Sequence, residues 1–368
     1  MRIPATKPEL PPRDLFIDEI SNIWKTGILT NQGEKVHRLQ SKLKSRIGCD
    51  NIELFVNGHT ALFLCIKSMG FPEKGEVLTS PFTFASTTNA ILQNNLTPVF
   101  CDINGSYNIS VSDVRKKISK KTCAIVAPHI FGIPCDVEEI ANIAKEYGLK
   151  VIYDGAQAFG TKIKGKDIGC FGDATMFSFH AIKVYNSIEG GALTFLDNSL
   201  EEKLHLYRNF GIPNEDKQQI ILPGYNGKMD ELRAAMGLVN LLRVDDVIEK
   251  RKRIAQQYIT ELKDINGINT YDYSSDVDYN YAYFPILIDE NKYGKSRDEL
   301  QNYLSQFGVG SRALYSRLTC DTICYQNIYE YELPIARMIS KSCLDLPLYS
   351  SLSKKDVSYI TDLIASCK

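Results

Sequence analysis

The sequence lacks a net charge, an apolar run long enough to cross a membrane, and a cysteine pattern typical of a metal site. Its 43 lysine and arginine residues balance 44 aspartate and glutamate residues, which leaves a net charge of −1. A chain this close to neutrality has no overall field that attracts nucleic acid or an anionic membrane. No stretch approaches the roughly 18 apolar residues that a membrane helix needs. Any anionic ligand must therefore be held by a local site.

The beginning of the chain and its cysteines indicate a cellular compartment. The segment MRIPATKPELPP lacks the apolar core of a signal peptide. We therefore expect a cytoplasmic protein whose ten cysteines are reduced thiols, several of them packed as small hydrophobic residues. Cys320 and Cys324 lie close together in the sequence, but no second Cys or His pair follows at an interval typical of zinc sites. No metal is predicted.

The order of apolar runs predicts the fold class. The chain has 368 residues, of which 44% are hydrophobic and 24% charged, enough for two domains. Apolar runs alternate with stretches of helical periodicity such as 136–148, whose final Gly148 is suited to end a helix. The expected strands are 77–80, 98–102, 124–130, 150–156, 175–180 and 192–195. Their continuous hydrophobicity predicts burial on both faces, and hence an α/β three-layer sandwich with a mainly parallel sheet.

The pattern changes in the last third of the chain. A long charged helical stretch begins near residue 238, and it is followed by an apolar run at 279–287 and a helical pattern at 298–308. We therefore expect a large domain over residues 1–240, and a bridging helix with a small C-terminal α+β domain over residues 241–368.

Ligands of parallel sheets collect beyond the carboxyl ends of the strands. The polar residues that close the expected strands are His129, Asp154 and His180. The segment VNGHTALFLCI (56–66) places an Asn-Gly turn before a helical run, so the N–H groups of His59, Thr60 and Ala61 are expected to form a phosphate site at a helix N-terminus. Alternatively, this turn only marks the start of a helix.

Three further segments carry candidate site residues. PFTFAST (81–87) follows a strand and offers two aromatic rings for stacking on a planar cofactor, although aromatics at this spacing are also typical of a core. Asp154 ends an apolar strand, and because an unpaired buried carboxylate is costly, a buried cation is implied. Lys183 in AIKVY has apolar neighbours that favour an amine able to attack a carbonyl; the alternative is a surface lysine whose stem covers apolar neighbours.

The four signals together have one economical explanation. A helix N-terminus for a phosphate, an aromatic ring for stacking, a carboxylate for a pyridinium nitrogen and a lysine for a Schiff base are the groups that pyridoxal phosphate requires. Each alternative is plausible singly, but four coincidences in one sheet are not. The sequence therefore predicts a pyridoxal phosphate site.

At this point the sequence resembles the nucleotide-sugar aminotransferases of the DegT and StrS group, within the fold-type I pyridoxal phosphate enzymes. The resemblance covers essentially the whole chain. The segments that carry it are LTNQGEKV (29–36), NGHTAL, FTFAST, PHIFGIPCD (128–136), YDGAQAFG, FSFHAIK, EGGAL, PGYNGKMDELRAAMG (223–237) and LDLPLY (344–349).

The resemblance implies specific roles for the residues of these segments. Lys183 matches the lysine that forms a Schiff base with the cofactor, and Asp154 matches the acid paired with the pyridine nitrogen. Gln157 matches the side chain that bonds the phenolic oxygen of the cofactor. Phe84 matches the residue stacked on the ring, and Ser178 matches a phosphate ligand.

Further phosphate contacts are implied by the Gly58–His59–Thr60 turn and by Asn226, which matches an asparagine of the neighbouring subunit. A homodimer with shared sites is therefore expected. His59 departs from the pattern, because the family commonly has Thr directly after this glycine; which side chain replaces the hydroxyl is left open. Related sugar dehydratases have His in place of the Schiff-base lysine, so Lys183 favours transamination.

The resemblance implies transfer of an amino group from L-glutamate to C4 of a nucleotide-linked keto sugar, dTDP-4-dehydro-6-deoxyglucose. The product is then expected to be an amino-dideoxy sugar for a surface glycan such as the O-antigen of lipopolysaccharide. Amination at C3 is the close alternative. A regulator that binds pyridoxal phosphate without turnover is disfavoured because no output module is visible. An aminotransferase or desulfurase for free amino acids is also disfavoured, because Cys170, the nearest cysteine in sequence to the lysine, is better placed for a structural role.

Overall fold

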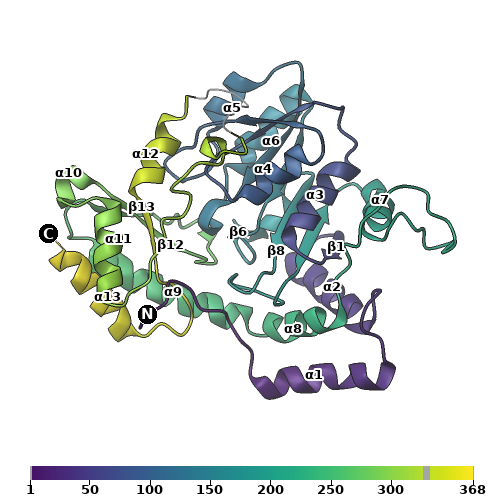
Figure 1. The fold of residues 1–368 in the computed structure, drawn as a ribbon, viewed down its shortest axis with the longest axis horizontal. Helices are drawn as coiled ribbons and strands as arrows, with labels where there is room; N and C mark the ends of the chain where they lie inside the picture. The colour runs from purple at the N-terminus through teal and green to yellow at the C-terminus, as the bar shows by residue number, and fades with distance from the viewer. Residues whose placement is uncertain (1, 326–331, 368) are drawn as a thin grey trace.

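The computed structural model describes residues 2–325 and 332–367. Its centre is a seven-stranded sheet with the order β1-β9-β8-β5-β4-β2-β3, in which the pairs from β8 through β5, β4 and β2 to β3 are parallel (Figure 1). The strands β8 and β1 pair antiparallel with β9. The bounds are β1 (Asn51–Phe55), β2 (Glu76–Thr79), β3 (Thr97–Phe100), β4 (Thr122–Pro128), β5 (Lys150–Asp154), β8 (Ala174–Ser178) and β9 (Gly191–Phe195). The mainly parallel α/β sheet is confirmed, and the six expected strands lie within two residues of their predicted bounds.

Helices cover both faces of this sheet. The bounds are α1 (Arg13–Thr26), α2 (Glu34–Ile47), α3 (Gly58–Ser68), α4 (Ala85–Leu92), α5 (Val111–Lys117), α6 (Val137–Tyr147), α7 (Ser199–Arg208) and α8 (Glu231–Leu241). Val151 packs in a core with α2, α6 and α8, whereas its neighbour Ile152 packs in a second core with α3, α4 and α7. Because successive strand residues point to opposite faces, this alternation establishes three layers.

Local signals explain where α6 begins and ends. The side chain of Asp136 accepts a hydrogen bond from the N–H of Glu139, which caps the first turn. Gly148 ends the helix at φ 67°, a left-handed conformation that glycine adopts without the penalty of a Cβ atom. The predicted C-cap at Gly148 is confirmed.

Strand β1 was not predicted, because Asn51 and Glu53 interrupt its apolar pattern. In the structure Glu53 is buried and forms an ion pair with the buried Arg208 of α7, so a charge occupies a position where the pattern needs a hydrophobic residue. The long helical stretch from residue 238 is likewise two helices, since α8 ends at Leu241 and α9 (Val244–Leu262) begins after a short break.

The C-terminal part has its own core around the antiparallel sheet β10-β12-β13. Its elements are β10 (Ile268–Thr270), β12 (Phe284–Ile288), β13 (Cys343–Leu346), α10 (Glu290–Tyr293), α11 (Arg297–Gln306), α12 (Pro334–Ser342) and α13 (Lys354–Ser366). A third small sheet joins β6 (Lys162–Ile163) and β7 (Lys166–Asp167) to β11 (Val277–Asp278). The helices α9, α11 and α13 pack around this C-terminal core, which confirms the expected α+β character.

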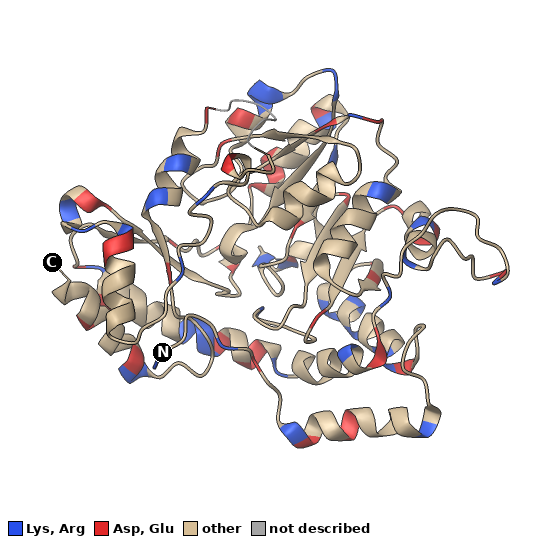
Figure 2. Ribbon diagram, in the orientation of Figure 1, with Lys and Arg blue, Asp and Glu red and all other residues tan. Residues whose placement is uncertain are grey.

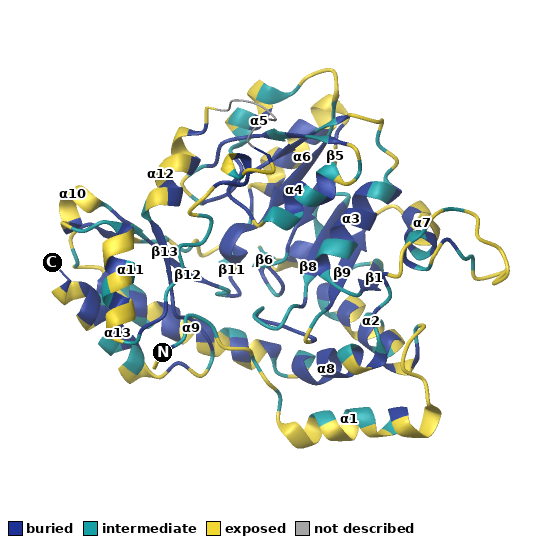
Figure 3. Ribbon diagram, in the orientation of Figure 1, coloured by how far each residue is buried: buried dark blue, intermediate teal, exposed yellow. Residues whose placement is uncertain are grey.

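Charged residues of both signs are distributed over the surface, and the exposure of the elements differs along the chain. Basic and acidic residues are interspersed over the helices (Figure 2). The central strands are buried, whereas much of α1 and most of the loop that projects after α7 are exposed (Figure 3). Within the described ranges, every helix is too short or too polar to span a bilayer.

Candidate active site

Asp154 ends β5 with its carboxylate buried in the interior. Thr87 Oγ1 donates to its Oδ2 at 2.7 Å, and the N–H of Ala156 donates to its Oδ1 at 3.0 Å. Burial raises the pKa of this carboxyl, and the two hydrogen bonds and the charges of Lys183 and His59 offset part of the rise. Among the described residues no cation forms an ion pair with Asp154. The implied buried cation is therefore not supplied by these residues, and a protonated ring nitrogen fits the place.

The N-terminus of α3 forms an anion cradle that differs from the expected one. Asn57 caps the helix: its Oδ1 accepts from the N–H of Thr60 at 2.8 Å, and its carbonyl accepts from the N–H of Ala61 at 3.2 Å. The expectation that the N–H groups of Thr60 and Ala61 are free is wrong, because the cap uses both. In the described part of the chain, the N–H groups without a partner at this end are those of Gly58 and His59.

Gly58 permits a close approach between this helix end and β8. A Cβ atom at Gly58 would lie 2.8 Å from the Cβ of Ser178, which no side chain tolerates without a shift. The hydroxyl-bearing residue at the end of β8 is thereby placed beside the free N–H groups of α3. Two N–H donors and Ser178 are the kind of donor set that binds a phosphate.

His59 joins two helices and does not act as a substitute hydroxyl. Its Nδ1 lies 2.9 Å from Ser86 Oγ and its Nε2 lies 3.2 Å from Gln93 Oε1. Ser86 is in the first turn of α4 and Gln93 caps its end, so the imidazole is held along that helix. Among the described residues the backbone N–H of His59 is thus free for an anion, while its ring connects α3 to α4.

Three of the remaining predicted residues lie around one small pocket. Gln157, Ser178 and Lys183 line it together with Asn280 and Tyr283 of the C-terminal part. Lys183 is partly buried, and its N–H donates to the carbonyl of His180 at 2.9 Å. The structure therefore brings the predicted lysine, glutamine and serine together, with residues from both parts of the chain.

Two predicted residues are available for contacts outside the chain. Phe84, at the N-cap of α4, is 69% exposed, which is unusual for a ring of this size. Asn226 is exposed in the loop before α8, and its neighbour Gly227 packs against Thr60 at the α3 cradle. Both residues thus lie on the surface near the site.

Three site residues were missed by sequence reasoning. Thr87 donates a hydrogen bond to the Asp154 carboxylate. The sequence shows a threonine in the helix that follows PFTF, but nothing in the sequence indicates that it reaches Asp154. Asn57 is the cap of α3, where the Asn-Gly pair was treated only as a turn. Tyr315 accepts from Gln157 Nε2 at 2.5 Å, while the N–H of Phe131 donates to Gln157 Oε1. The distant position of Tyr315 in the sequence carries no signal.

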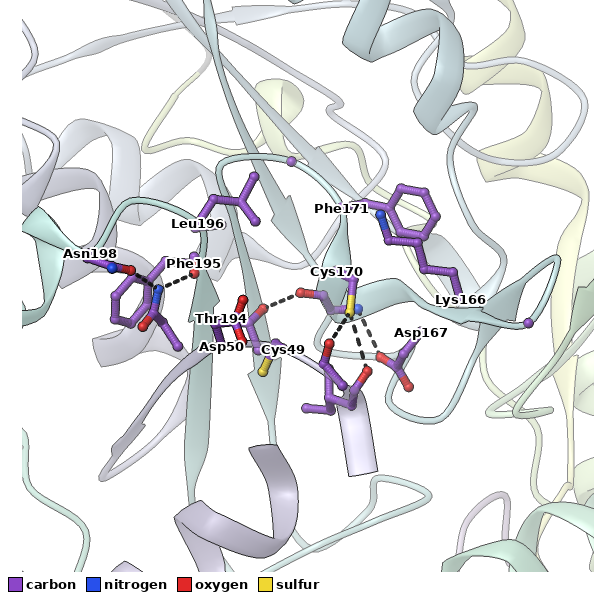
Figure 4. Close-up of a pocket in the computed structure, with 17 residues that line it drawn as sticks. Cys49, Asp50, Lys166, Asp167, Cys170, Phe171, Thr194, Phe195, Leu196 and Asn198 are labelled. Atoms are coloured by element: carbon purple, nitrogen blue, oxygen red, sulfur yellow. Dashed lines mark hydrogen bonds between the residues drawn. The ribbon is translucent and has the colours of Figure 1, made fainter. Parts of the chain in front are cut away.

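A larger pocket of about 570 Å³ lies at the opposite edge of the sheet (Figure 4). None of the predicted site residues lines it. Burial raises the pKa of the Cys49 thiol to about 11, and it also raises that of Cys170, whose thiol donates to the carbonyl of Ile47 at 3.3 Å. Thiols that stay protonated are poor nucleophiles. Cys170 precedes β8 and Lys183 follows it, so the two residues lie at opposite ends of this strand and the structure favours a structural role for Cys170.

A buried carboxylate without an ion pair among the described residues, a partly buried lysine and the free N–H groups of a helix N-terminus lie at the carboxyl edge of a mainly parallel sheet, where α/β enzymes bind their ligands. The chain belongs to the DegT/DnrJ/EryC1/StrS aminotransferase family, which matches residues 13–365. It is therefore an enzyme.

Its relatives include the dTDP-4-amino-4,6-dideoxy-D-glucose transaminase of Shigella dysenteriae, 38% identical over 99% of this chain and 98% of that protein. The Escherichia coli protein of the same description is also 38% identical, over 98% of each chain. Among solved structures, DesI in the presence of its TDP-sugar product has a TM-score of 0.94 and 29% identity, covering 100% of this chain and 93% of that one. The agreement extends over the full fold.

Asp154→Asn should make the cofactor-free protein more stable at neutral pH. Because burial raises the carboxyl pKa above its unfolded value, stability falls as pH rises from the unfolded pKa through the folded one. Asparagine does not ionise and avoids this loss, so the advantage should shrink toward about pH 4, near the ordinary pKa of aspartate. Urea unfolding at both pH values measures the difference.

The exposed Asp264→Asn is the matched control and should show no such pH-dependent gain. Added pyridoxal phosphate should stabilise the wild type more than Asp154→Asn, because a charged ring nitrogen pairs only with the carboxylate. If Asp154→Asn is no more stable than the wild type at neutral pH, the carboxylate is not the unpaired buried charge described above.

Proposed function

We propose that this enzyme uses pyridoxal phosphate to transfer an amino group from L-glutamate to C4 of a nucleotide-linked keto sugar, dTDP-4-dehydro-6-deoxyglucose. The observation that carries the proposal is the buried Asp154 carboxylate, which has hydrogen bonds but no cation among the described residues, next to Lys183. The relatives described as transaminases of dTDP-4-amino-4,6-dideoxy-D-glucose support the sugar and the position. The product would be an amino-dideoxy sugar.

Different residues of the site would bind different parts of the cofactor. The N–H groups of Gly58 and His59 and the hydroxyl of Ser178 would bind its phosphate, and Phe84 would stack on its ring. Gln157 Nε2 keeps a second N–H beyond the one given to Tyr315, which suits the phenolic oxygen. Bound pyridoxal phosphate would supply an electron-accepting ring that stabilises negative charge on the carbon next to the transferred nitrogen.

The chain itself moves the protons. Asp154 would hold a proton on the ring nitrogen of the bound cofactor, because its carboxylate lies in a dry setting where a positively charged partner is strongly favoured. Lys183 Nζ, once free, would take the proton from the carbon that bears the amino group of glutamate and pass it to a carbon of the bound cofactor. With the keto sugar it would carry a proton in the opposite direction, from the cofactor to the sugar carbon. Glutamate and the keto sugar would therefore use one site in turn.

A homodimer with shared sites is part of the proposal. Large apolar side chains are exposed on α1 and on the loop after α7, including Trp24 at 74% and Ile220 at 68%. Monomeric proteins rarely leave so many on the surface, and a second copy of the chain would cover them. Phe84 and Asn226 lie on the surface near the site, so a partner could complete it.

The reaction is tested with L-glutamate and a panel of nucleotide-linked 3-keto and 4-keto sugars. We expect 2-oxoglutarate to form with dTDP-4-dehydro-6-deoxyglucose and the amino group to be found at C4 by NMR. Amination of a 3-keto sugar alone would establish the C3 alternative. Turnover with free keto acids but with no sugar would contradict the proposed substrate class, and absence of any turnover would favour a regulator.

Lys183 should carry the cofactor. Borohydride reduction of the protein with pyridoxal phosphate should leave a pyridoxyl group on Lys183, detected by peptide mass, and Lys183→Ala should lose both the label and turnover. Lys228 is the matched control, since burial and Arg208 lower its pKa and make it the competing amine. Lys228→Ala should still be labelled on Lys183. A label on Lys228 in the wild type would contradict the assignment.

Asn226 should serve the cofactor of the neighbouring subunit. Inactive Lys183→Ala chains mixed with inactive Asn226→Asp chains, whose new carboxylate would repel the phosphate, should regain activity. In each mixed dimer one site then has both defects and the other has neither. If mass measurement confirms mixed dimers but no activity returns, Asn226 serves its own subunit. Its neighbour Gly227 packs against Thr60 of the same chain, which is consistent with that alternative.

A further inference from the structure

The loop that carries Lys183 is tied to an unexpected part of the chain, the N-terminal segment of residues 2–12. The loop leaves β8 after Ser178 and closes at its base, where the N–H of Ser187 donates to the carbonyl of Phe179 at 2.9 Å. Asn186, three residues after Lys183, is only 2% exposed, and its Nδ2 donates to the carbonyl of Glu9 at 2.9 Å.

Asn186 uses both ends of its side chain, since Nδ2 reaches the N-terminal segment and Oδ1 accepts a bond within the loop. Its Oδ1 accepts from the N–H of Ile188 at 3.3 Å. Ile188 has φ 71°, a left-handed conformation that is costly for a β-branched residue and persists only where neighbours hold it. The carbonyl of Asn186 accepts from Asn240 Nδ2 of α8 at 2.9 Å. Asn186 thus connects the loop to α8 and to the N-terminal segment at once.

Glu9 connects the same segment to the C-terminal part. Its Oε1 accepts from Arg251 Nη2 at 3.2 Å and from the N–H of Ser350 at 3.0 Å, and its Oε2 accepts from Ser350 Oγ at 2.5 Å. Arg251 lies in α9 and is 2% exposed, with its other bonds to carbonyl groups. In the described chain Glu9 is the carboxylate that pairs with this buried cation.

The N-terminal segment has a second anchor. Ile3 is 2% exposed in the C-terminal core and forms a β-bridge with Val309, so the segment is held at both residue 3 and residue 9. In Figure 1 it runs beside α9 before it continues to α1. Its backbone carbonyl at Glu9 is therefore a fixed point against which the Lys183 loop is held.

We propose that Asn186 and Glu9 are positioning residues for Lys183: the N-terminal segment, clamped to α9 and to the Ser350 loop by the Glu9 carboxylate, holds the Lys183 loop through Asn186. The proposal rests on the proposed function only in taking Lys183 as the reacting amine. Proton transfer by Lys183 Nζ needs a fixed geometry, and small misplacements of a reacting group lower the rate strongly. Loosening the loop should therefore lower kcat and leave substrate affinity nearly unchanged.

The test compares Asn186→Asp, Glu9→Ala and the control Glu261→Ala in the full-length protein. Asn186→Asp keeps the shape but faces the Glu9 carbonyl with an acceptor in place of a donor. Glu9→Ala removes the clamp without altering any residue of the site. Glu261 is a matched carboxylate that accepts from Gln257, Ser358 and Thr361, and so joins α9 to α13 far from the Lys183 loop.

The first readout is amide hydrogen exchange of residues 180–190 in the protein without cofactor. We expect exchange there to rise on the order of tenfold in Asn186→Asp and in Glu9→Ala, but not in Glu261→Ala, because local opening follows the loss of local contacts. This readout does not depend on the chemistry at Lys183, which the borohydride experiment decides separately.

The second readout is kinetic. In both variants kcat should fall on the order of tenfold, with the KM values for both substrates within about twofold of wild type. The proposal is overturned if the two variants lower the melting temperature as Glu261→Ala does, yet keep wild-type exchange at 180–190 and wild-type kcat. If Asn186→Asp fails to fold, Glu9→Ala decides alone by the same two readouts.

Discussion

The carboxylate of Asp154 lies in a dry interior at the end of β5, and the surrounding elements are arranged to keep it there. Thr87 and the N–H of Ala156 satisfy two of its lone pairs, which lowers the cost of burial but does not remove it, since burial still raises the carboxyl pKa. The described residues provide no cation in contact with it. The site is therefore prepared for a positive charge that comes from outside the chain.

The helices α3 and α4 are joined to each other and, through α4, to Asp154. Thr87 brings the first turn of α4 to Asp154, and His59 joins the first turn of α3 to Ser86 and Gln93 of the α4 region. Helix N-termini carry partial positive charge and free N–H groups, so the two helices direct their favourable ends toward the place where an anion and a planar ring would bind. The small size of Gly58 then lets α3 approach β8. The buried carboxylate thus contacts α4 directly, whereas α3 is positioned through His59 and Gly58.

The C-terminal part completes the pocket. Tyr315 binds Gln157, and Asn280 Nδ2 donates to the carbonyl of Gln157 at 2.8 Å, so residues far along the chain hold the loop that follows Asp154. Tyr315 also lies in an aromatic cluster with Phe82 and Phe131, beside the β2 and β4 ends of the large sheet. The two parts of the chain therefore meet at the site, and a movement of one would alter contacts in the other.

By itself the sequence determined the six strands of the sheet, the α/β class, and the residue types at the strand ends. These features depend on local patterns: continuous hydrophobicity for a strand, a glycine after α6, and a polar residue such as Asp154 that closes an apolar run. Strand β1 was missed because a buried Glu53 hides it, and its partner Arg208 is known only once the chain is folded. The free N–H groups of α3 were misassigned because the cap by Asn57 depends on a side-chain conformation.

Only the tertiary structure decided which groups meet. Thr87 reaches Asp154 across 67 positions of sequence, His59 reaches Ser86 across 27, and Gln157 reaches Tyr315 across 158. No sequence periodicity links such pairs. Their contacts arise only when elements that are far apart in the sequence pack against each other. The types of residue needed for the chemistry could therefore be predicted from the sequence. The residues that hydrogen-bond to them and hold them in place were determined by the packing of the layers.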